Sequence, residues 1–169
     1  MDSPPKKISV LFVCMGNICR SPAAEGVFAE YVRRAGHEDI FHIDSAGTLD
    51  YHTGSLPDDR MCMAAARRGY KLQSFARQVS SADLGHFDLV LAMDHTNLDE
   101  LNQLAGGPRQ HIRLFGSFLG SPSASDGAFP AVPDPYYGGV DGFELVLDMI
   151  EAACPPLLEH CLALRNRQR

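Results

Sequence analysis

The sequence predicts an α/β fold: a single-domain three-layer α/β/α sandwich with a four-stranded parallel sheet and helices on both faces. Short apolar runs typical of strands buried on both faces alternate with segments whose apolar residues have helical spacing. Strands that alternate with helices form parallel sheets with right-handed crossovers. A chain of 169 residues, 45% of them apolar, can bury one core and is too short for two. We therefore expect residues 1–169 to form a single domain.

The first strand is expected at residues 8–13, a nearly continuous apolar run rich in branched side chains. A helix should begin at Ser21 and Pro22, because serine can cap the free amides and proline suits the first helical position. Its apolar residues keep helical spacing up to Gly36. Because strand, tight loop and helix together form an anion-binding geometry, a phosphate loop is predicted between the first strand and the first helix.

The alternation continues through the middle of the chain. Apolar runs and helical spacing follow one another, with Gly, Pro and polar residues between them. The expected elements are strands at 41–45, 87–93 and 112–115, helices at 58–68 and 97–104, and a short helical turn that starts at the capping-box sequence Ser80–Asp83.

The last third of the chain has two parts. Residues 116–142 are rich in Gly, Ser and Pro, and a loop of that length is usually functional or mobile. A final helix is expected from residue 143 to about residue 164. Pro155 and Pro156 lie inside it, and because an interior proline costs about 3 kcal/mol, they predict a kink or a break into two helices. Flexible tails are expected at 1–6 and 165–169.

Charge and cysteine content exclude several classes of protein. The 15 basic and 21 acidic side chains give a formal charge of -6, which argues against a nucleic-acid binder or a polybasic membrane anchor. No segment approaches the roughly 20 apolar residues needed to cross a membrane. Five cysteines without a repeating framework favour free thiols in a reducing, cytoplasmic compartment. The histidines show no ligand spacing, so we expect no metal and no cofactor.

The segment Cys14-Met-Gly-Asn-Ile-Cys-Arg20-Ser21 carries the chemistry of a phosphate site. The helix N-terminus directs backbone N–H groups and the positive end of its dipole at one point. Arg20 adds a planar two-pronged donor that matches two phosphate oxygens. The same field favours the thiolate of Cys14, which makes it a nucleophile at neutral pH. Gly16 and Asn17 both accommodate positive φ and should curl the loop, and the Ser21 hydroxyl can donate to the sulfur.

Cys14 and Cys19 have an alternative interpretation as small packing residues, which is the usual place of buried cysteine. A strand before the motif, a helix start after it, and Gly and Asn within it favour the phosphate site, because context is what supports a motif.

The run Val13-Cys-Met-Gly-Asn-Ile-Cys-Arg-Ser-Pro-Ala-Ala-Glu25 resembles the signature of the low-molecular-weight protein tyrosine phosphatases. This resemblance implies hydrolysis of protein phosphotyrosine to tyrosine and phosphate through a phosphocysteine intermediate. Further matches span nearly the whole chain: Asp44-Ser-Ala-Gly-Thr48, Ala76-Arg-Gln78, Phe87-Asp-Leu-Val-Leu-Ala-Met-Asp94, Val132-Pro-Asp-Pro-Tyr-Tyr137 and Phe143-Glu144.

The resemblance implies that Cys14 is the nucleophile, Arg20 holds the phosphoryl group and Asp134 is the general acid. The chemistry requires such an acid, because a phenolate leaving group needs a proton. From the sequence alone, Asp126 and Asp141 are rivals on the same loop. The substrate-binding positions implied are Met15, Gly16, Asn17, Ile18, Cys19, Ser21, Tyr51 and Tyr136. Of these, Tyr51 falls where the family places an aromatic at the pocket rim, although an ordinary exposed loop tyrosine is the alternative.

Other positions have supporting or regulatory roles by resemblance. Ser45 matches a residue that hydrogen-bonds the Asn17 region. Many relatives carry a histidine where this chain has Ser74, which puts the rigidity of the loop in question. The family pattern implies that peroxide joins Cys14 and Cys19 in a reversible disulfide. Tyr136 and Tyr137 are candidate targets of a tyrosine kinase or simply substrate contacts; the expected partners are tyrosine-phosphorylated proteins, with the chain a monomer or weak homodimer.

Three other functions compete. A thioredoxin-coupled arsenate reductase needs two further cysteines close together, and the region around Cys62 supplies one. A protein-arginine phosphatase would resemble relatives with threonine at the position of Ile18, and isoleucine there leaves room for a flat phenyl ring. A catalytically silent phosphotyrosine-binding module would not need Asp134 beside Cys14 and Arg20.

Overall fold

The computed structural model describes residues 3–168, and its centre is a sheet of four parallel strands in the order β2-β1-β3-β4. The predicted α/β fold with a four-stranded parallel sheet is confirmed. The first strand is central, so its carboxyl end is flanked by both neighbours. The strands are β1 (Ile8–Cys14), β2 (Phe41–Gly47), β3 (Leu89–Ala92) and β4 (Ile112–Leu114).

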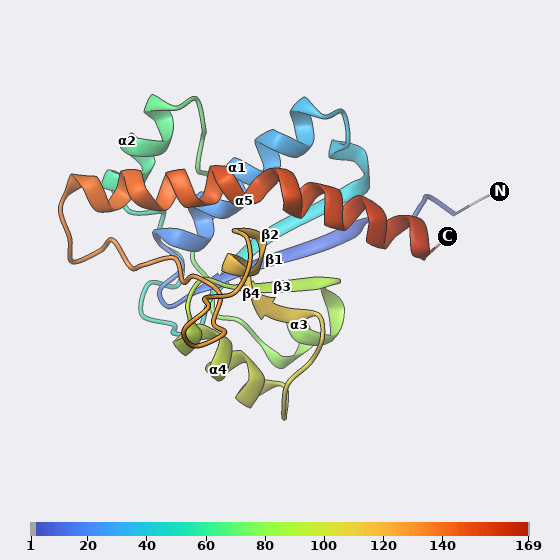
Figure 1. The fold of residues 1–169 in the computed structure, drawn as a ribbon. Coiled ribbons are helices and arrows are strands. Elements are labelled where there is room, and N and C mark those ends of the chain that lie inside the picture. Colours follow the sequence, from blue (N-terminus) through green and yellow to red (C-terminus); the bar gives the residue numbers. More distant parts are fainter. Residues whose placement is uncertain (1–2, 169) are drawn as a thin grey trace.

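Helices within the described residues cover both faces of the sheet (Figure 1). One face carries α1 (Arg20–Arg34), α2 (Asp59–Arg67) and α5 (Val140–Arg167), and the other carries α3 (Ser81–His86) and α4 (His95–Leu104). None of these helices is both long and apolar enough to cross a membrane.

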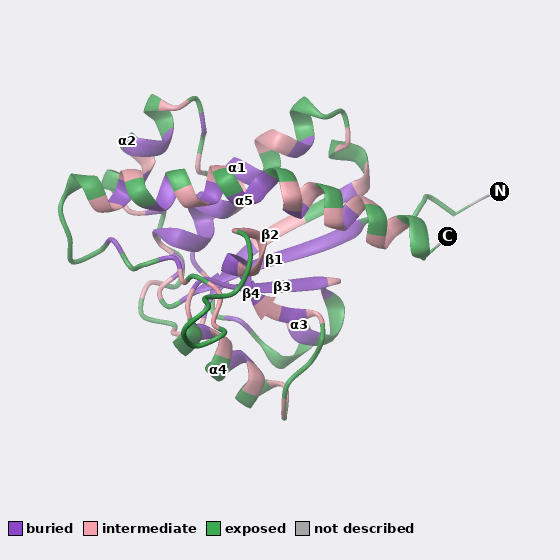
Figure 2. Cartoon of the chain, viewed as in Figure 1, coloured by how far each residue is buried: buried purple, intermediate pink, exposed green. Residues whose placement is uncertain are grey.

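Strand β1 supplies both cores because successive side chains of a strand point to opposite faces. Val10 and Phe12 belong to the cluster formed with α1 and α5, and Leu11 and Val13 to the cluster formed with α3 and α4. Every residue of β1 is buried, and Figure 2 shows this strand in the buried colour between the two helical layers.

Helix α5 is one continuous helix through Pro155 and Pro156, so of the predicted kink or break, the break into two helices is wrong. The residues on either side of the proline pair, Cys154 and Leu157, are both 0% exposed and hold the two halves against the same core. Pro155 faces solvent. The core contacts along one face thus outweigh the local cost of the prolines.

The chain ends differ in part from the expected tails. Residues 3–7 are exposed and outside regular structure, whereas α5 continues to Arg167, into the segment expected to be flexible. The expected tail residues 1, 2 and 169 lie outside the described part of the chain.

The long loop is shorter than predicted. A 3₁₀ helix at Phe115–Phe118 directly follows β4, and α5 begins at Val140, which leaves residues 119–139 irregular. This segment returns to the carboxyl end of β3, where the Val132 N–H donates to the Met93 carbonyl at 2.8 Å. Val132 is fully buried, so it fixes the position of the residues that follow it.

Candidate active site

The loop between β1 and α1, residues 14–20, curls around a single point and is called the phosphate loop below. Asn17 adopts a left-handed backbone conformation with φ 58°, as the sequence suggested. Its side chain joins the loop to two other segments: Nδ2 donates to Ser21 Oγ at 2.7 Å, and Oδ1 accepts from the Arg77 backbone N–H at 3.0 Å. These bonds stabilise the curled loop. Gly16 has no positive φ, so its expected part in the turn is wrong; a Cβ there would lie 3.1 Å from the His52 ring.

The end of β2 packs directly against the phosphate loop. The Thr48 N–H donates to the Cys14 carbonyl at 2.9 Å, and the Leu49 N–H donates to the Met15 carbonyl at 3.0 Å. A Cβ on Gly47 would lie 2.7 Å from the Met15 carbonyl oxygen, so this approach requires glycine. The Ser-Ala-Gly-Thr motif therefore has a structural role as the backing of the loop.

The Cys14 thiol lies at the floor of the phosphate loop and is surrounded by donors. Its Sγ is 3.0 Å from Ser21 Oγ, and the Asn17 backbone N–H points to it at 3.3 Å. Ser21 Oγ accepts from the Asn17 amide, so its own proton can point at the sulfur or at the Ala46 carbonyl oxygen 3.4 Å away. The sulfur, at 3.0 Å, is the closer of the two. Both donors stabilise negative charge on Sγ. The prediction that Ser21 caps α1 is wrong: Cys19 is the N-cap residue, and Ser21 lies inside the helix.

The Arg20 guanidinium is held by three groups at the carboxyl edge of the sheet. Nη1 donates to Asp94 Oδ2 at 2.6 Å and to the Val132 carbonyl at 3.1 Å, and Nη2 lies 3.7 Å from Asp134 Oδ2. The Arg20 side chain is only 3% exposed. A buried cation fixed in this way is preorganised for an anion in the loop. The pairing of Asp94 with Arg20 was missed, although Asp94 belongs to one of the resembling motifs.

Asp134 is the loop aspartate that the fold brings to the phosphate loop. Its Oδ1 accepts from the Tyr136 backbone N–H at 3.0 Å, which orients the carboxylate, and 30% of the side chain remains exposed. Its rivals lie elsewhere: Asp126 caps a turn by accepting from the Ala128 N–H, and Asp141 is in the first turn of α5. Neither rival lines the cavity above Cys14.

A cavity of about 240 Å³, called the loop pocket, opens above the phosphate loop. Tyr51 and Tyr137 stand at its rim with 81% and 84% exposure. Asn17 and Ser21, predicted to bind substrate, are buried behind the loop rather than in the wall. Leu49 and His52 were missed, since neither residue belongs to a recognisable motif. The wall residues are Cys14, Met15, Gly16, Ile18, Cys19, Arg20, Leu49, Tyr51, His52, Asp134, Tyr136 and Tyr137.

The expected hydrogen bond from Ser45 to the Asn17 region is wrong. Ser45 Oγ instead donates to Glu25 Oε1 at 2.6 Å, and the partners of the Asn17 side chain are Ser21 and the Arg77 backbone. Ser45 therefore ties β2 to α1 one turn beyond Ser21. The Arg77 side chain is itself fixed by two carboxylates, Asp44 and Asp83.

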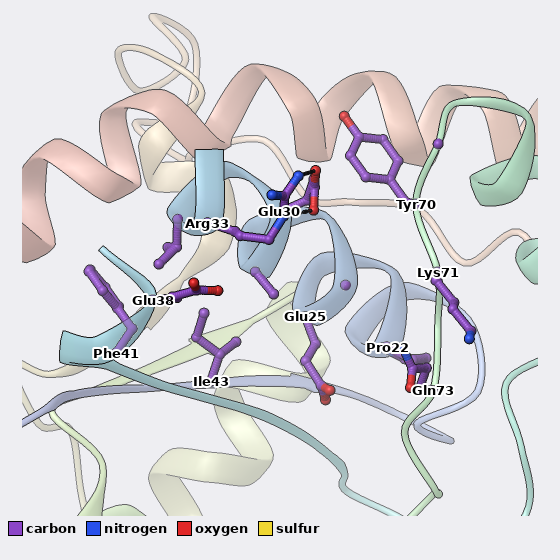
Figure 3. Close-up of a pocket in the computed structure, with 14 residues that line it drawn as sticks. Pro22, Glu25, Glu30, Arg33, Glu38, Phe41, Ile43, Tyr70, Lys71 and Gln73 are labelled. Carbon is purple, nitrogen blue, oxygen red and sulfur yellow. Dashed lines mark hydrogen bonds and ion pairs between the residues drawn. The ribbon is translucent and has the colours of Figure 1, made fainter. Parts of the chain in front are cut away.

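Glu25 lines a separate cavity of about 520 Å³ between α1, β2 and residues 69–73 (Figure 3). Burial raises the pKa of Glu25 to about 7, more than the hydrogen bond from Ser45 lowers it. In Figure 3 its carboxylate points away from Glu30 and Arg33, which pair with each other on the outer face of α1. Glu25 is thus a half-buried acid next to the phosphate loop but outside the loop pocket.

The remaining thiols differ from Cys14 in their surroundings. Cys19 lines the same pocket, and burial, with the charge of Asp58, raises its pKa. Burial also raises the pKa of Cys154 and Cys161 in the core. The five cysteines are free thiols. Among residues 3–168, no three His, Cys, Asp or Glu side chains are grouped so that they could hold a metal ion.

The fold and the site define a class. A strand–loop–helix anion site with a cysteine at its floor, a buried arginine and a neighbouring aspartate is typical of cysteine-based phosphoric monoester hydrolases. The family model described as "Low molecular weight phosphotyrosine protein phosphatase" matches residues 9–168. The chain belongs to this family, and the resemblance noted in the sequence is confirmed.

Individual relatives share the sequence and the fold. The low molecular weight phosphotyrosine protein phosphatase of Schizosaccharomyces pombe is 46% identical over 140 residues, which cover 82% of this chain and 86% of the relative. The crystal structure of YfkJ from Bacillus subtilis is 36% identical with a TM-score of 0.83, and the match covers 99% of this chain and 100% of YfkJ. DARP, a Drosophila arginine phosphatase, is 33% identical with a TM-score of 0.78 over 89% of this chain and 96% of its own.

Proposed function

We propose that this chain hydrolyses phosphotyrosine in proteins, with Cys14 as nucleophile, Arg20 as phosphate ligand and Asp134 as general acid. The observation that carries the proposal is that two distant segments, the phosphate loop and the irregular segment before α5, meet at the loop pocket. Cys14 comes from the end of β1, Arg20 from the start of α1, and Asp134 from the irregular segment before α5. Asp94 already pairs with the Arg20 guanidinium from outside the loop pocket, whereas Asp134 lines the pocket and is 30% exposed, so it can reach a leaving group that must be protonated.

In the first step, Cys14 Sγ forms a bond to phosphorus while the bond to the tyrosine oxygen breaks. Asp134 gives its proton to that oxygen, so neutral tyrosine leaves. Arg20 and the loop N–H groups bind the phosphoryl oxygens throughout. In the second step, Asp134 takes a proton from water, the water oxygen bonds to phosphorus, and Sγ leaves as a thiolate. Ser21 Oγ, 3.0 Å from Sγ, stabilises the thiolate in both steps.

The shape of the loop pocket supports an aryl phosphate. Ile18 and Leu49 provide apolar walls, and Tyr51 and Tyr136 add aromatic faces around the opening. A phenyl ring fits between such walls and carries its phosphate to the floor, whereas the shorter phosphoserine side chain would have to bring the peptide backbone into the pocket. We therefore propose tyrosine-phosphorylated proteins as substrates.

The test is metal-free hydrolysis of p-nitrophenyl phosphate and of matched phosphotyrosine, phosphoserine and phosphoarginine peptides. Cys14→Ser should abolish turnover. Asp134→Ala should lower turnover of the phosphotyrosine peptide about 10² to 10⁴-fold. Asp126→Ala, on the same segment but outside the pocket, is the matched control and should keep the wild-type rate. An active Cys14→Ser variant, or an Asp126→Ala variant as impaired as Asp134→Ala, would refute the assignment.

The phosphoarginine peptide distinguishes the tyrosine and arginine phosphatase activities that the names of the structural neighbours give. Ile18 lines the loop pocket, and we expect it to favour the flat phenyl ring over a guanidinium. Cys154 and Cys161 are completely buried, which removes them as relay thiols for arsenate reduction.

We propose that residues 1–169 form one cytoplasmic phosphatase domain, a monomer or weak homodimer. Cys14 and Cys19 line one pocket and would form a reversible disulfide with peroxide. Tyr137, 84% exposed, and Tyr136, 37% exposed, are accessible to a tyrosine kinase.

A further inference from the structure

A second hollow of about 290 Å³, called the α2–α5 hollow, lies next to the loop pocket. Helix α2 contributes one side, and the start of α5 with the two residues before it contributes the other. The rim side chains Met63 and Val140 are apolar, yet 61% and 68% exposed. The lining residues are Arg60, Met63, Ala64, Arg67, Gly138, Gly139, Val140 and Phe143.

Arg60 separates this hollow from the loop pocket. Its guanidinium carbon lies 5.3 Å from the centroid of the Tyr136 ring, which lines the loop pocket, and 4.9 Å from that of the Phe143 ring, which lines the hollow. Its Nη2 donates to the Tyr136 carbonyl at 3.1 Å, and Asp58 holds the guanidinium with two further bonds. The Arg60 side chain, held in place by these contacts, is thus the partition between the two cavities.

We propose that the α2–α5 hollow is a specificity subsite, which binds a large aliphatic side chain close to the phosphotyrosine of the substrate. This inference rests on the proposed function and adds a sequence preference to it. The Tyr136 and Phe143 rings are each within reach of the Arg60 guanidinium, so they lie no more than about 10 Å apart. An extended peptide covers about 10 Å in three residues. A peptide whose phosphotyrosine fills the loop pocket therefore places a residue within three positions over the hollow.

The charges around the hollow select an apolar occupant. Arg60 is already paired with Asp58 at 3.0 Å, and Arg67 with Glu144 at 3.6 Å, so both guanidinium groups have partners. The Arg60 guanidinium lies against the Phe143 ring, and its charge is met by Asp58. Gly138 and Gly139 carry no side chains that could fill it. An aliphatic side chain would remove the exposed faces of Met63 and Val140 from water, which is favourable in proportion to the area covered.

The experiment measures kcat/KM for phosphotyrosine peptides with Leu, Ala or Asp at each position from three residues before to three after the phosphotyrosine. For wild-type protein we expect Leu to exceed Ala by about tenfold at one of these positions, the lower end of what a hydrophobic pocket discriminates. Met63→Ser and Val140→Ser should reduce that ratio to about twofold. Leu104→Ser changes an exposed leucine, 43% exposed, at the end of α4 on the opposite face, and should leave the ratio unchanged.

Each variant is also assayed with p-nitrophenyl phosphate, which carries no peptide and therefore reports activity at the loop pocket alone. A wild-type protein that turns over no phosphotyrosine peptide refutes the proposed function and, with it, the subsite. Efficient turnover without a Leu preference, or with one that Met63→Ser leaves intact, overturns the subsite alone. The alternative occupant of the hollow is a second copy of the chain, and sedimentation velocity tests it. A wild-type dimer that Met63→Ser dissociates would show that the second copy covers the hollow, which also overturns the proposal.

Discussion

The Arg20 guanidinium donates to Asp94 Oδ2 at 2.6 Å, so the cation of the site is oriented by a residue in the neighbouring strand–helix connection, between β3 and α4. Asp94 has a second duty, because its Oδ1 accepts from the Asn97 N–H at 2.8 Å and caps α4. One carboxylate therefore couples the start of α1 to the start of α4.

Asp94→Ala should lower both stability and activity. It takes the nearest carboxylate away from a buried guanidinium and removes a helix cap, which we expect to cost about 3 kcal/mol in the free energy of unfolding. Turnover of p-nitrophenyl phosphate should fall by about tenfold or more because Arg20 is no longer oriented. Asp94→Asn keeps one oxygen, which can accept either from Arg20 or from the Asn97 N–H, and should therefore lose less stability and less activity than Asp94→Ala. Urea denaturation and steady-state kinetics test this, and equal effects of Ala and Asn would contradict it.

Asn17 combines backbone strain with two side-chain hydrogen bonds, and two substitutions separate these contributions. Asn17→Gly keeps access to φ 58° but loses the bonds to Ser21 and Arg77, whereas Asn17→Ala loses both advantages. We expect Asn17→Ala to be about 1 kcal/mol less stable than Asn17→Gly, the cost of a left-handed conformation for a residue with a Cβ. Both variants should have lower kcat. The comparison requires unfolding curves for the two proteins, and the prediction fails if their midpoints coincide.

Glu25 should make stability depend on pH near neutrality. Its pKa in the folded protein, about 7, lies above the ordinary value of 4.5. A raised carboxyl pKa favours folding while the group is protonated, so this contribution is complete below pH 4.5 and is lost as the pH rises to about 7. When the pH rises from 5 to 8, the free energy of unfolding should fall by about 2 kcal/mol less for Glu25→Gln than for the wild type. Urea denaturation at each pH measures this difference.

The matched control for Glu25 is Glu30→Gln on the same helix. Hydrogen bonds from Arg33, together with Arg34, lower the pKa of Glu30 to about 2, so it stays ionised throughout that range. Its variant should show the wild-type pH dependence between pH 5 and pH 8. A pH profile that Glu25→Gln leaves unchanged would count against burial as the cause of the raised pKa.

Pro155→Ala should stabilise the protein. The ring of Pro155 is exposed, so its removal creates no cavity, and the new N–H can donate to the Glu151 carbonyl one turn earlier. Interior proline is about 3 kcal/mol less favourable than alanine, but Pro156 remains, so we expect a gain of about 1 kcal/mol. Pro155→Gly restores the same N–H, but glycine has a lower helix propensity than alanine, so this variant should gain less stability than Pro155→Ala. Thermal denaturation of the three proteins decides, and a lower melting temperature for Pro155→Ala would refute this prediction.

Features encoded by neighbouring residues could be predicted from the sequence. The strand–loop–helix unit around Cys14 and the capping box at Ser80 depend on residues close in the chain, and both occur as expected. Asp134 needed the family resemblance, because nothing local distinguishes it from Asp126. The pairing of Asp94 with Arg20 could not be predicted, since it depends on how two distant turns meet at the sheet edge.

Three predictions were wrong because the structure gives the residue contacts that neither its local sequence nor the family resemblance revealed. Ser21 would cap α1 in isolation, but its hydroxyl binds Cys14 and Asn17 instead. Ser45 was assigned to Asn17, but Glu25 is its partner. Pro155 would end a free helix, but the buried residues beside the proline pair hold α5 together. For Ser21 and Ser45 the partner lies in another element of the fold, whereas α5 is held together by its own residues packed on the core.

The attachment of residues 119–139 has a consequence for how activity is lost. The nucleophile lies on the central strand, whereas Asp134 is carried by a mostly exposed segment whose buried residues are Val132 and Pro135. Segments with few buried contacts open at a lower free energy than the sheet. On warming, proton delivery should therefore fail first, while the intact loop still retains oxyanions. Heat inactivation would precede global melting, and the inactivated protein would act as a reversible trap for phosphate rather than as an unfolded chain.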